Sequence, residues 1–463
     1  MIPKTTLARI VARQRKNLDD RIAGMPRAIL ASMPYLTDQA LLIGGVRGSG
    51  RSTLLLQMLQ NDYPQAWYTD FSDARLAGFD SGDFDKLSAL VAESGKGILL
   101  LDKVDYAQGW ARFIGSKLAE GIKVVATVSL DTLLAVQQAR QEGTDLQLAG
   151  SAAVQEAVVS ASLFIPRRLG LFGYLEFLEA VHRRGGEEAV EEYLLRGAFP
   201  ECCRPVRTAS LLSLYDLIVN RDVLIAKGVR DRVTLCRIAL FLLTATGGGV
   251  TANAVRNQLK VKSVSTVTEH MEHLERAGLV AFVPILGTTP GRQAVNPRKV
   301  YAVDTALAAA LSPEESLSRE RHFASLIHNH VALKYDAIFY TPECGGCDFV
   351  VAEEGFIAGC IQACYDGDDP DLMQMKIEGL SEAMRQGGQR RGLIVTLGRS
   401  ERIPVEEGEI EIIDADTFRC GHFGQAGHRH NIPCQRNHKS RTVGKTNLPH
   451  GDPETLRATQ QRC

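Results

Sequence analysis

The sequence lacks several features that would assign it to a specialised class. It has no apolar run long enough to cross a lipid bilayer, which argues against a membrane-spanning protein. Its 10 cysteines are spread thinly, so we expect free thiols rather than a disulfide framework. A formal net charge of −1 excludes a protein that attracts polyanions through its overall charge.

The amino-terminal stretch, MIPKTTLARIVARQRKNLDD, also lacks the hydrophobic core of a signal peptide, because it is basic and amphipathic throughout. Together with the expected free thiols, this predicts a cytoplasmic protein without membrane contact. The 463 residues are 45% hydrophobic, enough to bury substantial cores in about two to four domains.

The most informative segment begins at Leu41 and has the outline of a phosphate-binding loop. A short apolar strand, 40–43, precedes the glycine-rich stretch GGVRGSGRST, and a helix-forming run follows it. Glycines let backbone N–H groups turn toward a phosphate, the helix N-terminus adds positive potential, and a serine or threonine hydroxyl reaches Mg²⁺. The alternative to a phosphate site is a glycine-rich turn that serves packing alone.

Two further strands strengthen the case for a site. GILLLD ends in Asp102, and KVVATVS ends in Ser129, whose hydroxyl would lie near a terminal phosphate. Parallel strands place their carboxyl ends at one edge of an open sheet, where ligands bind. The pattern therefore predicts a nucleotide site with a carboxylate for Mg²⁺ at that edge.

The order of these motifs, followed by FGYLEFL and YLLRGAFPE, resembles a bacterial and archaeal family of AAA-type ATPases. In that family the ATPase domain precedes a winged helix and a domain related to restriction endonucleases, and the match runs from about Leu36 to Cys420. The resemblance implies an α/β multidomain fold that binds ATP or ADP with Mg²⁺. The implied site has Asp102 and Ser129 as catalytic residues, Ser52 and Asp102 at the metal, and Gly45, Val46, Arg47, Gly48, Ser49, Gly50, Arg51, Ser52 and Thr53 around the nucleotide.

Two residues depart from the family pattern. The family has lysine where this chain has Arg51, and arginine is a bulkier cation that cannot act as a compact point charge. The family also has an acidic residue where this chain has Lys103, and an ammonium cannot activate water as a base. Asp105 is a candidate substitute. We therefore predict nucleotide binding with weak or absent hydrolysis; the alternatives are a working ATPase, and a nucleotide-independent scaffold that binds DNA or protein.

Three arginines are candidates for a sensor or trans role, with a plain surface or salt-bridge role as the alternative: Arg167, Arg168 and Arg221.

The middle of the chain is helical and then has the pattern of a helix-turn-helix with a wing. One hypothesis is that this region binds DNA through the second helix and the wing. The other is that it binds protein or serves a structural role, which the acidic character of that helix favours. The residues concerned are Ser263, Ser265 and Thr266 near the helix start, Arg292, Arg298 and Lys299 in the wing, and Glu269, Glu272 and Glu275 against Arg276 on the helix.

The carboxy-terminal region returns to an α/β pattern. At the three places where nuclease-like domains carry metal ligands and a lysine, this chain has His328, Asp348 and the run from Gln362 to Cys364, so we expect the fold without nuclease activity. The triplet His328, Asn329, His330 is interpreted as chance within a helix. Four cysteines of this region have a spacing that resembles that of zinc ligands: Cys344, Cys347, Cys360 and Cys364. The alternative is that they are small buried residues of strands.

Beyond Cys420 the chain is polar and basic, with seven Lys or Arg residues against two acidic ones. This surplus of five leaves a net charge of −6 on the remainder, and the composition predicts a disordered tail. The expected organisation is a helical segment at 1–35, an AAA-type P-loop domain at 36–180, a helical lid at 181–243, a winged helix at 244–312, an inactive nuclease-like domain at 313–419 and the tail at 420–463. The oligomeric state is left open.

Overall fold

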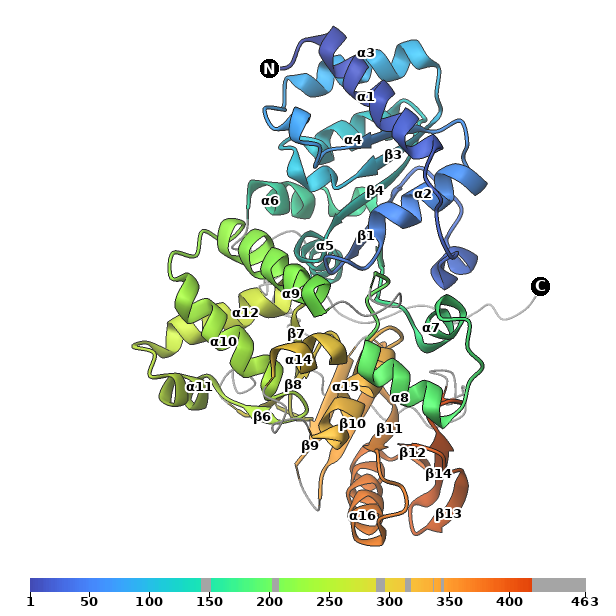
Figure 1. Cartoon of the computed structure of the whole chain (residues 1–463), viewed down its shortest axis with the longest axis vertical. Coiled ribbons are helices and arrows are strands. Elements are labelled where there is room, and N and C mark those ends of the chain that lie inside the picture. Colours follow the sequence, from blue (N-terminus) through green and yellow to red (C-terminus); the bar gives the residue numbers. More distant parts are fainter. Residues whose placement is uncertain are drawn as a thin grey trace, which may run out of the picture.

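The computed structural model describes residues 1–142, 151–201, 208–288, 296–312, 318–335, 337–342 and 345–418. It has the expected mixed α/β architecture, with a parallel sheet in the first domain, a mainly helical middle and a second large sheet at the opposite end (Figure 1). Across these described ranges, no helix combines the length and apolar character needed to cross a membrane. The tail from residue 420 onward lies outside the described residues.

The first domain is built on a parallel sheet with the strand order β2-β3-β4-β1-β5. Its central strands are continuous apolar runs because both faces of a parallel sheet are covered by helices. The strands are β1 (Ala40–Gly45), β2 (Trp67–Asp70), β3 (Ile98–Asp102), β4 (Lys123–Ser129) and β5 (Phe164–Arg168).

The helices of this domain divide between the two faces of the sheet. Leu54 and Leu55 of the second helix pack with Ile43 on one face, whereas the third to sixth helices share a core with Leu42 on the other. Leu7 of the first helix belongs to the latter core, so the predicted amino-terminal segment is part of this domain. The helices are α1 (Lys4–Asp19), α2 (Arg51–Asn61), α3 (Asp83–Ser94), α4 (Trp110–Ala119), α5 (Leu130–Glu142) and α6 (Ala152–Val159), with a short 3₁₀ turn η3 (Val104–Tyr106) after β3.

The helices expected to form one lid at 181–243 divide between two cores. Ala189 and Val190 of α8 pack with the carboxy-terminal domain, whereas α9, η5 and α10 pack with the middle domain. Amphipathic spacing showed that each helix has a buried face but could not show which partner covers it. The elements are α7 (Tyr174–Ala180), α8 (Glu187–Arg196), α9 (Thr208–Leu217), the π-helical η5 (Ile218–Ile225) and α10 (Arg232–Thr244).

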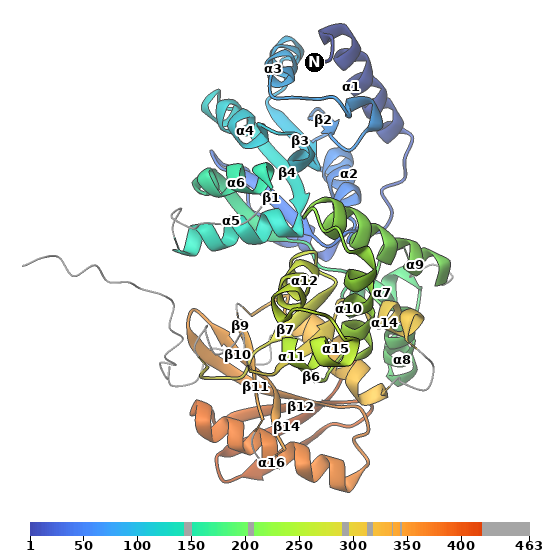
Figure 2. The same ribbon diagram turned by 90° about the vertical axis from the view of Figure 1, so that its left-hand side faces the viewer.

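The middle domain combines short helices with a small antiparallel sheet of order β6-β8-β7. This arrangement has the elements that a winged helix requires, and the assignment to that class stays a prediction. Figure 2 shows the helix α12 (Val264–Arg276) below α5 of the first domain. The elements are β6 (Gly249–Val250), α11 (Ala252–Leu259), α12 (Val264–Arg276), β7 (Val280–Val283), β8 (Arg298–Ala302) and α14 (Thr305–Leu311).

The carboxy-terminal domain is a mixed sheet of order β13-β14-β12-β11-β10-β9. Phe323 packs on the face that carries Phe349 and Val351, and Leu380 packs on the face that carries Val350, so one helix covers each side. The elements are α15 (Arg319–Val331), β9 (Ala337–Thr341), β10 (Cys347–Glu353), β11 (Phe356–Cys364), α16 (Pro370–Gly387), β12 (Arg391–Thr396), β13 (Glu401–Val405) and β14 (Gly408–Asp414).

Candidate functional site

The glycine-rich loop joins β1 to α2 in the geometry expected of a phosphate-binding loop. Gly48 and Gly50 have φ values of 85° and 93°, which glycine adopts without strain. A Cβ at Gly45 would lie 2.4 Å from the carbonyl oxygen of Leu169, so that position also requires glycine. Ser52 and Thr53 follow in the first turn of α2, where free backbone N–H groups point toward the loop.

The sheet brings the predicted strand ends to one edge. Gly45 of β1 is the register partner of Ser129 of β4, and Asp102 of β3 is the partner of Asp70 of β2. The loop, Asp102 and Ser129 therefore share the carboxyl edge of the sheet, as parallel strands require.

Ser129 forms hydrogen bonds at the start of α5 through its backbone and its hydroxyl. Its backbone N–H donates to Asp105 Oδ2 at 2.8 Å, and its hydroxyl lies 2.9 Å from the Thr132 hydroxyl. Thr132 Oγ1 also donates to Asp105 Oδ2 at 2.9 Å. Asp105 thus stabilises the turn between β4 and α5, which weighs against it as a base that replaces the family's acidic residue. The phosphate-sensing role of Ser129 stays a prediction.

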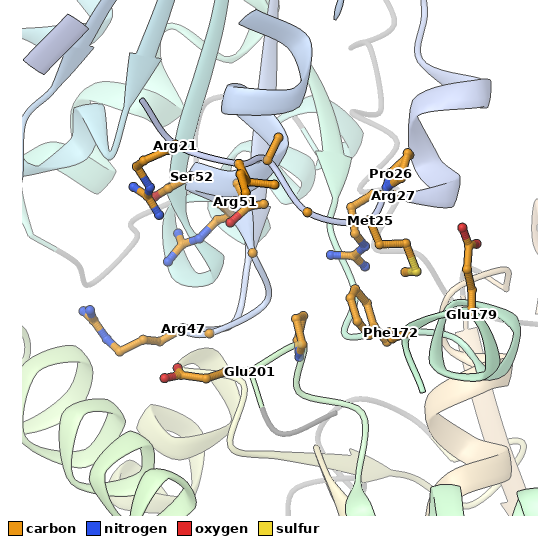
Figure 3. A pocket seen from close by; sticks show the side chains of 18 of the residues that line it. Arg21, Met25, Pro26, Arg27, Arg47, Arg51, Ser52, Phe172, Glu179 and Glu201 are labelled. Carbon is orange, nitrogen blue, oxygen red and sulfur yellow. The ribbon is translucent and has the colours of Figure 1, made fainter. Parts of the chain in front are cut away.

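A cavity of about 900 Å³ opens beside the loop (Figure 3). Arg21, Arg51 and Ser52 gather on one side of it, and Met25 and Phe172 form an apolar wall on the other. The cavity thus has two arginines on one side and apolar surface on the other, where Arg27 and Glu179 also lie. Further lining residues include Pro26, Arg27, Arg47, Gly48, Gly50, Thr53, Lys103, Glu179, His182, Pro200 and Glu201.

Arg51, which stands where the resembling family has lysine, donates from its guanidinium to the carbonyl oxygen of Val128 at the end of β4. Its side chain is half-buried and still lines the cavity. The longer side chain therefore reaches across the loop to the neighbouring strand, which restricts how far it can follow a phosphate.

Arg47 connects the loop to the helical region. Its guanidinium donates to Asp222 of η5 at 2.8 Å and to the Tyr106 hydroxyl at 3.1 Å. The ion pair with Asp222 raises the pKa of Arg47 despite the opposing effect of burial. Leu214 of α9 and Phe199, which follows α8, lie close to Gly48, so the loop packs directly against these residues.

Arg27 is a buried residue of the site that the sequence did not reveal. Its guanidinium lies 2.8 Å from Glu176 Oε1, donates to the carbonyl oxygen of Ser49 at 2.6 Å, and stacks over the Phe172 ring. It also donates to the carbonyl oxygen of Gly170 at 2.9 Å. No local pattern marks a buried arginine in an irregular segment, because all its partners are distant in sequence.

Asp102 is fully buried at the end of β3 and is not among the residues that line the cavity. Its Oδ1 accepts from the Thr127 hydroxyl at 2.5 Å, and its Oδ2 accepts from the Tyr68 hydroxyl at 3.3 Å. Burial and the charge of Asp102 raise the pKa of Tyr68, so this phenol stays a hydrogen-bond donor.

Lys103 stands between this carboxylate and the cavity. Its ammonium lies 3.8 Å from Asp102 Oδ2 and 3.6 Å from Asp70 Oδ2, and donates to the Ser72 hydroxyl at 2.9 Å. Ser52 lines the cavity, whereas Asp102 does not, and both carboxylate oxygens of Asp102 already have partners, namely Thr127 on Oδ1 and Tyr68 and Lys103 on Oδ2. The residues at this position therefore do not fit a divalent cation in the arrangement that the structure has.

The three candidate sensor arginines do not line the cavity. Arg167 and Arg168 are exposed on β5, and Arg221 is exposed on η5 beside Asp222.

In the middle domain, α12 faces the first domain at its carboxy-terminal end. Arg276 donates to Asp131, the second residue of α5, and Lys227 forms an ion pair with the same carboxylate at 2.5 Å. Glu275 is largely buried and accepts from the backbone N–H of Phe282 at 3.2 Å, and burial raises its pKa. Glu269 and Glu272 are exposed on α12, whereas Arg292 lies outside the described residues.

Asp348, the carboxylate found at one of the three places compared with nuclease-like domains, has charged partners that the sequence did not indicate. Glu320 of α15 lies 3.1 Å from the ammonium of Lys376 of α16, which in turn lies 3.1 Å from Asp348 Oδ2. Lys299 of β8 lies 2.6 Å from Asp348 Oδ1. Lys376 therefore lies between Asp348 and a second carboxylate, Glu320, and both Lys376 and Glu320 come from helices that no strand motif marks. Because two ammoniums already neutralise Asp348, the prediction of lost nuclease activity is kept.

His328 and the cysteines of this domain are structural in character. His328 lies in α15, stacks on Tyr301 at 4.5 Å, and has a pKa lowered to about 4 by burial. Burial also raises the pKa of Cys347 to about 12 and that of Cys360 well above its usual range, which keeps both thiols protonated. Cys344 lies outside the described residues, and among the residues the structure does describe, no group of metal-ligating side chains is assembled.

Two family models match separate parts of the chain. A model described as an AAA domain matches residues 37–148, and a domain of unknown function matches residues 187–318. The first part of the chain is therefore an AAA-type P-loop domain, of the class that binds nucleotides. The second match continues across the predicted boundary between lid and winged helix at residues 243 and 244.

Whole-protein relatives are distant. An uncharacterized protein of Haemophilus influenzae is 24% identical over 286 residues, which is 55% of this chain and 66% of that protein. Among solved structures, the Thermotoga maritima RuvB Holliday junction branch migration motor is similar with a TM-score of 0.27 and 14% identity, covering 53% of this chain and 82% of that one. A variant of the same motor has 17% identity and the same TM-score.

Proposed function

We propose that the chain binds ATP or ADP in the cavity beside the glycine-rich loop and hydrolyses ATP weakly or not at all. The carrying observation is the loop itself, where three glycines are required by backbone geometry and a cationic cavity opens directly over the helix N-terminus. The phosphates would lie toward Arg51 and Ser52, and the base toward Met25 and Phe172.

The proposal of weak hydrolysis rests on the carboxylates near the loop, as far as the described residues show them. Asp102 is followed by Lys103, and Asp105 accepts two hydrogen bonds at the start of α5. Within the described ranges, the carboxylates that line the cavity are Glu179 and Glu201, both across it from Ser52 (Figure 3). General base catalysis contributes about 10²- to 10⁴-fold, so its loss leaves binding without effective turnover. A working ATPase is the competing proposal.

For the middle domain we favour a protein-coupling role over DNA binding. The carboxy-terminal end of α12 is bound to α5 through Arg276 and Asp131, and the exposed positions on α12 include Glu269 and Glu272. This acidic surface is poorly matched to a polyanion. A DNA partner would show itself as salt-dependent binding of duplex DNA by the full chain, with a loss of affinity in Arg298→Ala.

The nucleotide proposal is tested by following melting temperature and phosphate release in the same samples, with ATP and with ADP. A ligand at 100 times its dissociation constant stabilises the folded state by about 2.7 kcal/mol, which should raise the melting temperature clearly. Arg51→Ala should lose most of this shift, whereas Arg13→Ala, an exposed arginine of α1 outside the cavity, should retain it. Stabilisation with steady phosphate release would establish an ATPase, and no stabilisation with either nucleotide would refute the proposal.

A further inference from the structure

We infer that Lys103 is a built-in cation of the nucleotide site, so that this P-loop binds nucleotide without a divalent metal ion. The inference rests on the proposed nucleotide binding and concerns which species of nucleotide the site takes. It is carried by the position of one ammonium group between two carboxylates and the cavity.

The two carboxylates are brought together by strand pairing. Asp70 ends β2 and Asp102 ends β3, and the two residues are register partners in adjacent parallel strands. Two carboxylates at paired positions repel each other, and a nearby cation offsets that repulsion. The ammonium of Lys103 lies within 4 Å of both, at 3.6 Å from Asp70 Oδ2 and 3.8 Å from Asp102 Oδ2.

The backbone directs the lysine into this position. Lys103 has φ 51° and ψ 46°, a left-handed conformation that is costly for a residue with a Cβ. Its N–H donates to the Thr127 hydroxyl at 2.7 Å, and that hydroxyl donates to Asp102 at 2.5 Å, so the turn is bound to the carboxylate that the ammonium neutralises. The Ser72 hydroxyl accepts from the ammonium at 2.9 Å and donates to Asp70 at 2.7 Å.

The cavity side of this arrangement is cationic. Lys103 lines the cavity and Asp102 does not, so a bound phosphate would meet the ammonium before the carboxylate. Arg51 and Arg21 also line the cavity and lie near each other in it (Figure 3). A triphosphate without Mg²⁺ carries more negative charge than its Mg²⁺ complex and is the better match to Arg51 and Arg21, while the Lys103 ammonium offsets the carboxylates behind it. A Mg²⁺ ion near Asp102 would instead be repelled by the ammonium.

The test is calorimetric titration of the full chain with ATP, once in excess EDTA and once in excess Mg²⁺. The wild-type chain should bind at least as tightly in EDTA as in Mg²⁺. Lys103→Glu should bind about tenfold or more weakly in EDTA, with recovery in Mg²⁺, because a charge-assisted contact is replaced by a repulsive one. Lys262→Glu makes the same charge change at an exposed residue of the middle domain and should behave as wild type.

Lys103→Met tests the same point without adding a carboxylate, and the melting temperature of each unliganded variant reports whether it folds. Lys103→Met should also weaken binding in EDTA. Wild-type binding that requires Mg²⁺ would overturn the inference and leave the proposed nucleotide binding intact. An absence of binding under both conditions would refute the proposed function as well.

Discussion

The carboxylate of Asp131 joins three parts of the fold, and its removal is expected to loosen them together. Lys227, just after η5, lies 2.5 Å from its Oδ2, and Arg276 of α12 donates to its Oδ1. The side chains are 16%, 10% and 17% exposed in the order Asp131, Lys227, Arg276, so solvent screens these pairs little. Asp131→Asn would leave two cations without a counter-charge.

A hydrogen bond to a charged group is worth about 1.5–3 kcal/mol, and asparagine keeps one acceptor, so we expect a loss of about 3 kcal/mol from the contact between the first and middle domains. Because the chain has several cores, a single unfolding free energy is not the right measure. Hydrogen exchange of α5 and α12 is the suitable assay, and protection there should fall about a hundredfold.

The matched control is Asp19→Asn, which removes the carboxylate of an exposed pair with Arg15 on α1. An exposed pair of this kind is worth about 0.3–0.5 kcal/mol, so the control should leave protection in α5 and α12 unchanged. If Asp131→Asn were as mild as this control, the contact between the domains would be maintained by apolar packing, and the electrostatic reasoning would be wrong.

Two further predictions concern stability. Gly44→Ala would place a Cβ 2.4 Å from Cβ of Leu133, so it should destabilise the first domain by about 1–3 kcal/mol in a thermal melt. Gly97→Ala is the comparison, because a Cβ at this exposed residue would have open space and Gly97 is not among the glycines with positive φ. Burial alone would raise the pKa of Asp348, but Lys376 and Lys299 outweigh it and hold that pKa well below its usual range. The stabilisation is therefore present above the unfolded pKa of about 4 and is lost as pH falls below it, which urea titrations at decreasing pH should show and Asp348→Asn should abolish.

The parallel sheet and the edge at which its motifs meet were predictable from the sequence because the signals are local. A buried strand needs a run of apolar residues, a tight loop needs glycine, and parallel strands place their ends at one edge. These rules brought Gly45, Asp102 and Ser129 together correctly. The division of the helical region was not predictable, since periodicity shows that α8 has a buried face without showing that the carboxy-terminal sheet covers it.

The remaining parts of the site depend on contacts between residues far apart in sequence. Arg27 reaches Glu176 across 149 positions, and Lys376 reaches Asp348 from a helix that carries no recognisable motif. Neither pair leaves a spacing that a pattern could detect. Ser129 shows another limit, because its place at a strand end predicts a role at a phosphate but could not show that its hydroxyl lies 2.9 Å from the Thr132 hydroxyl.

The two departures from the family pattern are best understood together. Arg51 replaces a lysine in the loop and is bound to the carbonyl oxygen of Val128, so its cation is anchored to β4. Lys103 replaces an acidic residue after Asp102 and carries an ammonium to the cavity from β3. Taken singly, each change weakens a site of this kind. In the proposed site, an ammonium follows the strand that ends in Asp102, so the site would have a cation of its own where the resembling family has a base. Lys103→Glu should therefore weaken nucleotide binding in EDTA and restore it in Mg²⁺, where any gain in phosphate release would come from the new carboxylate.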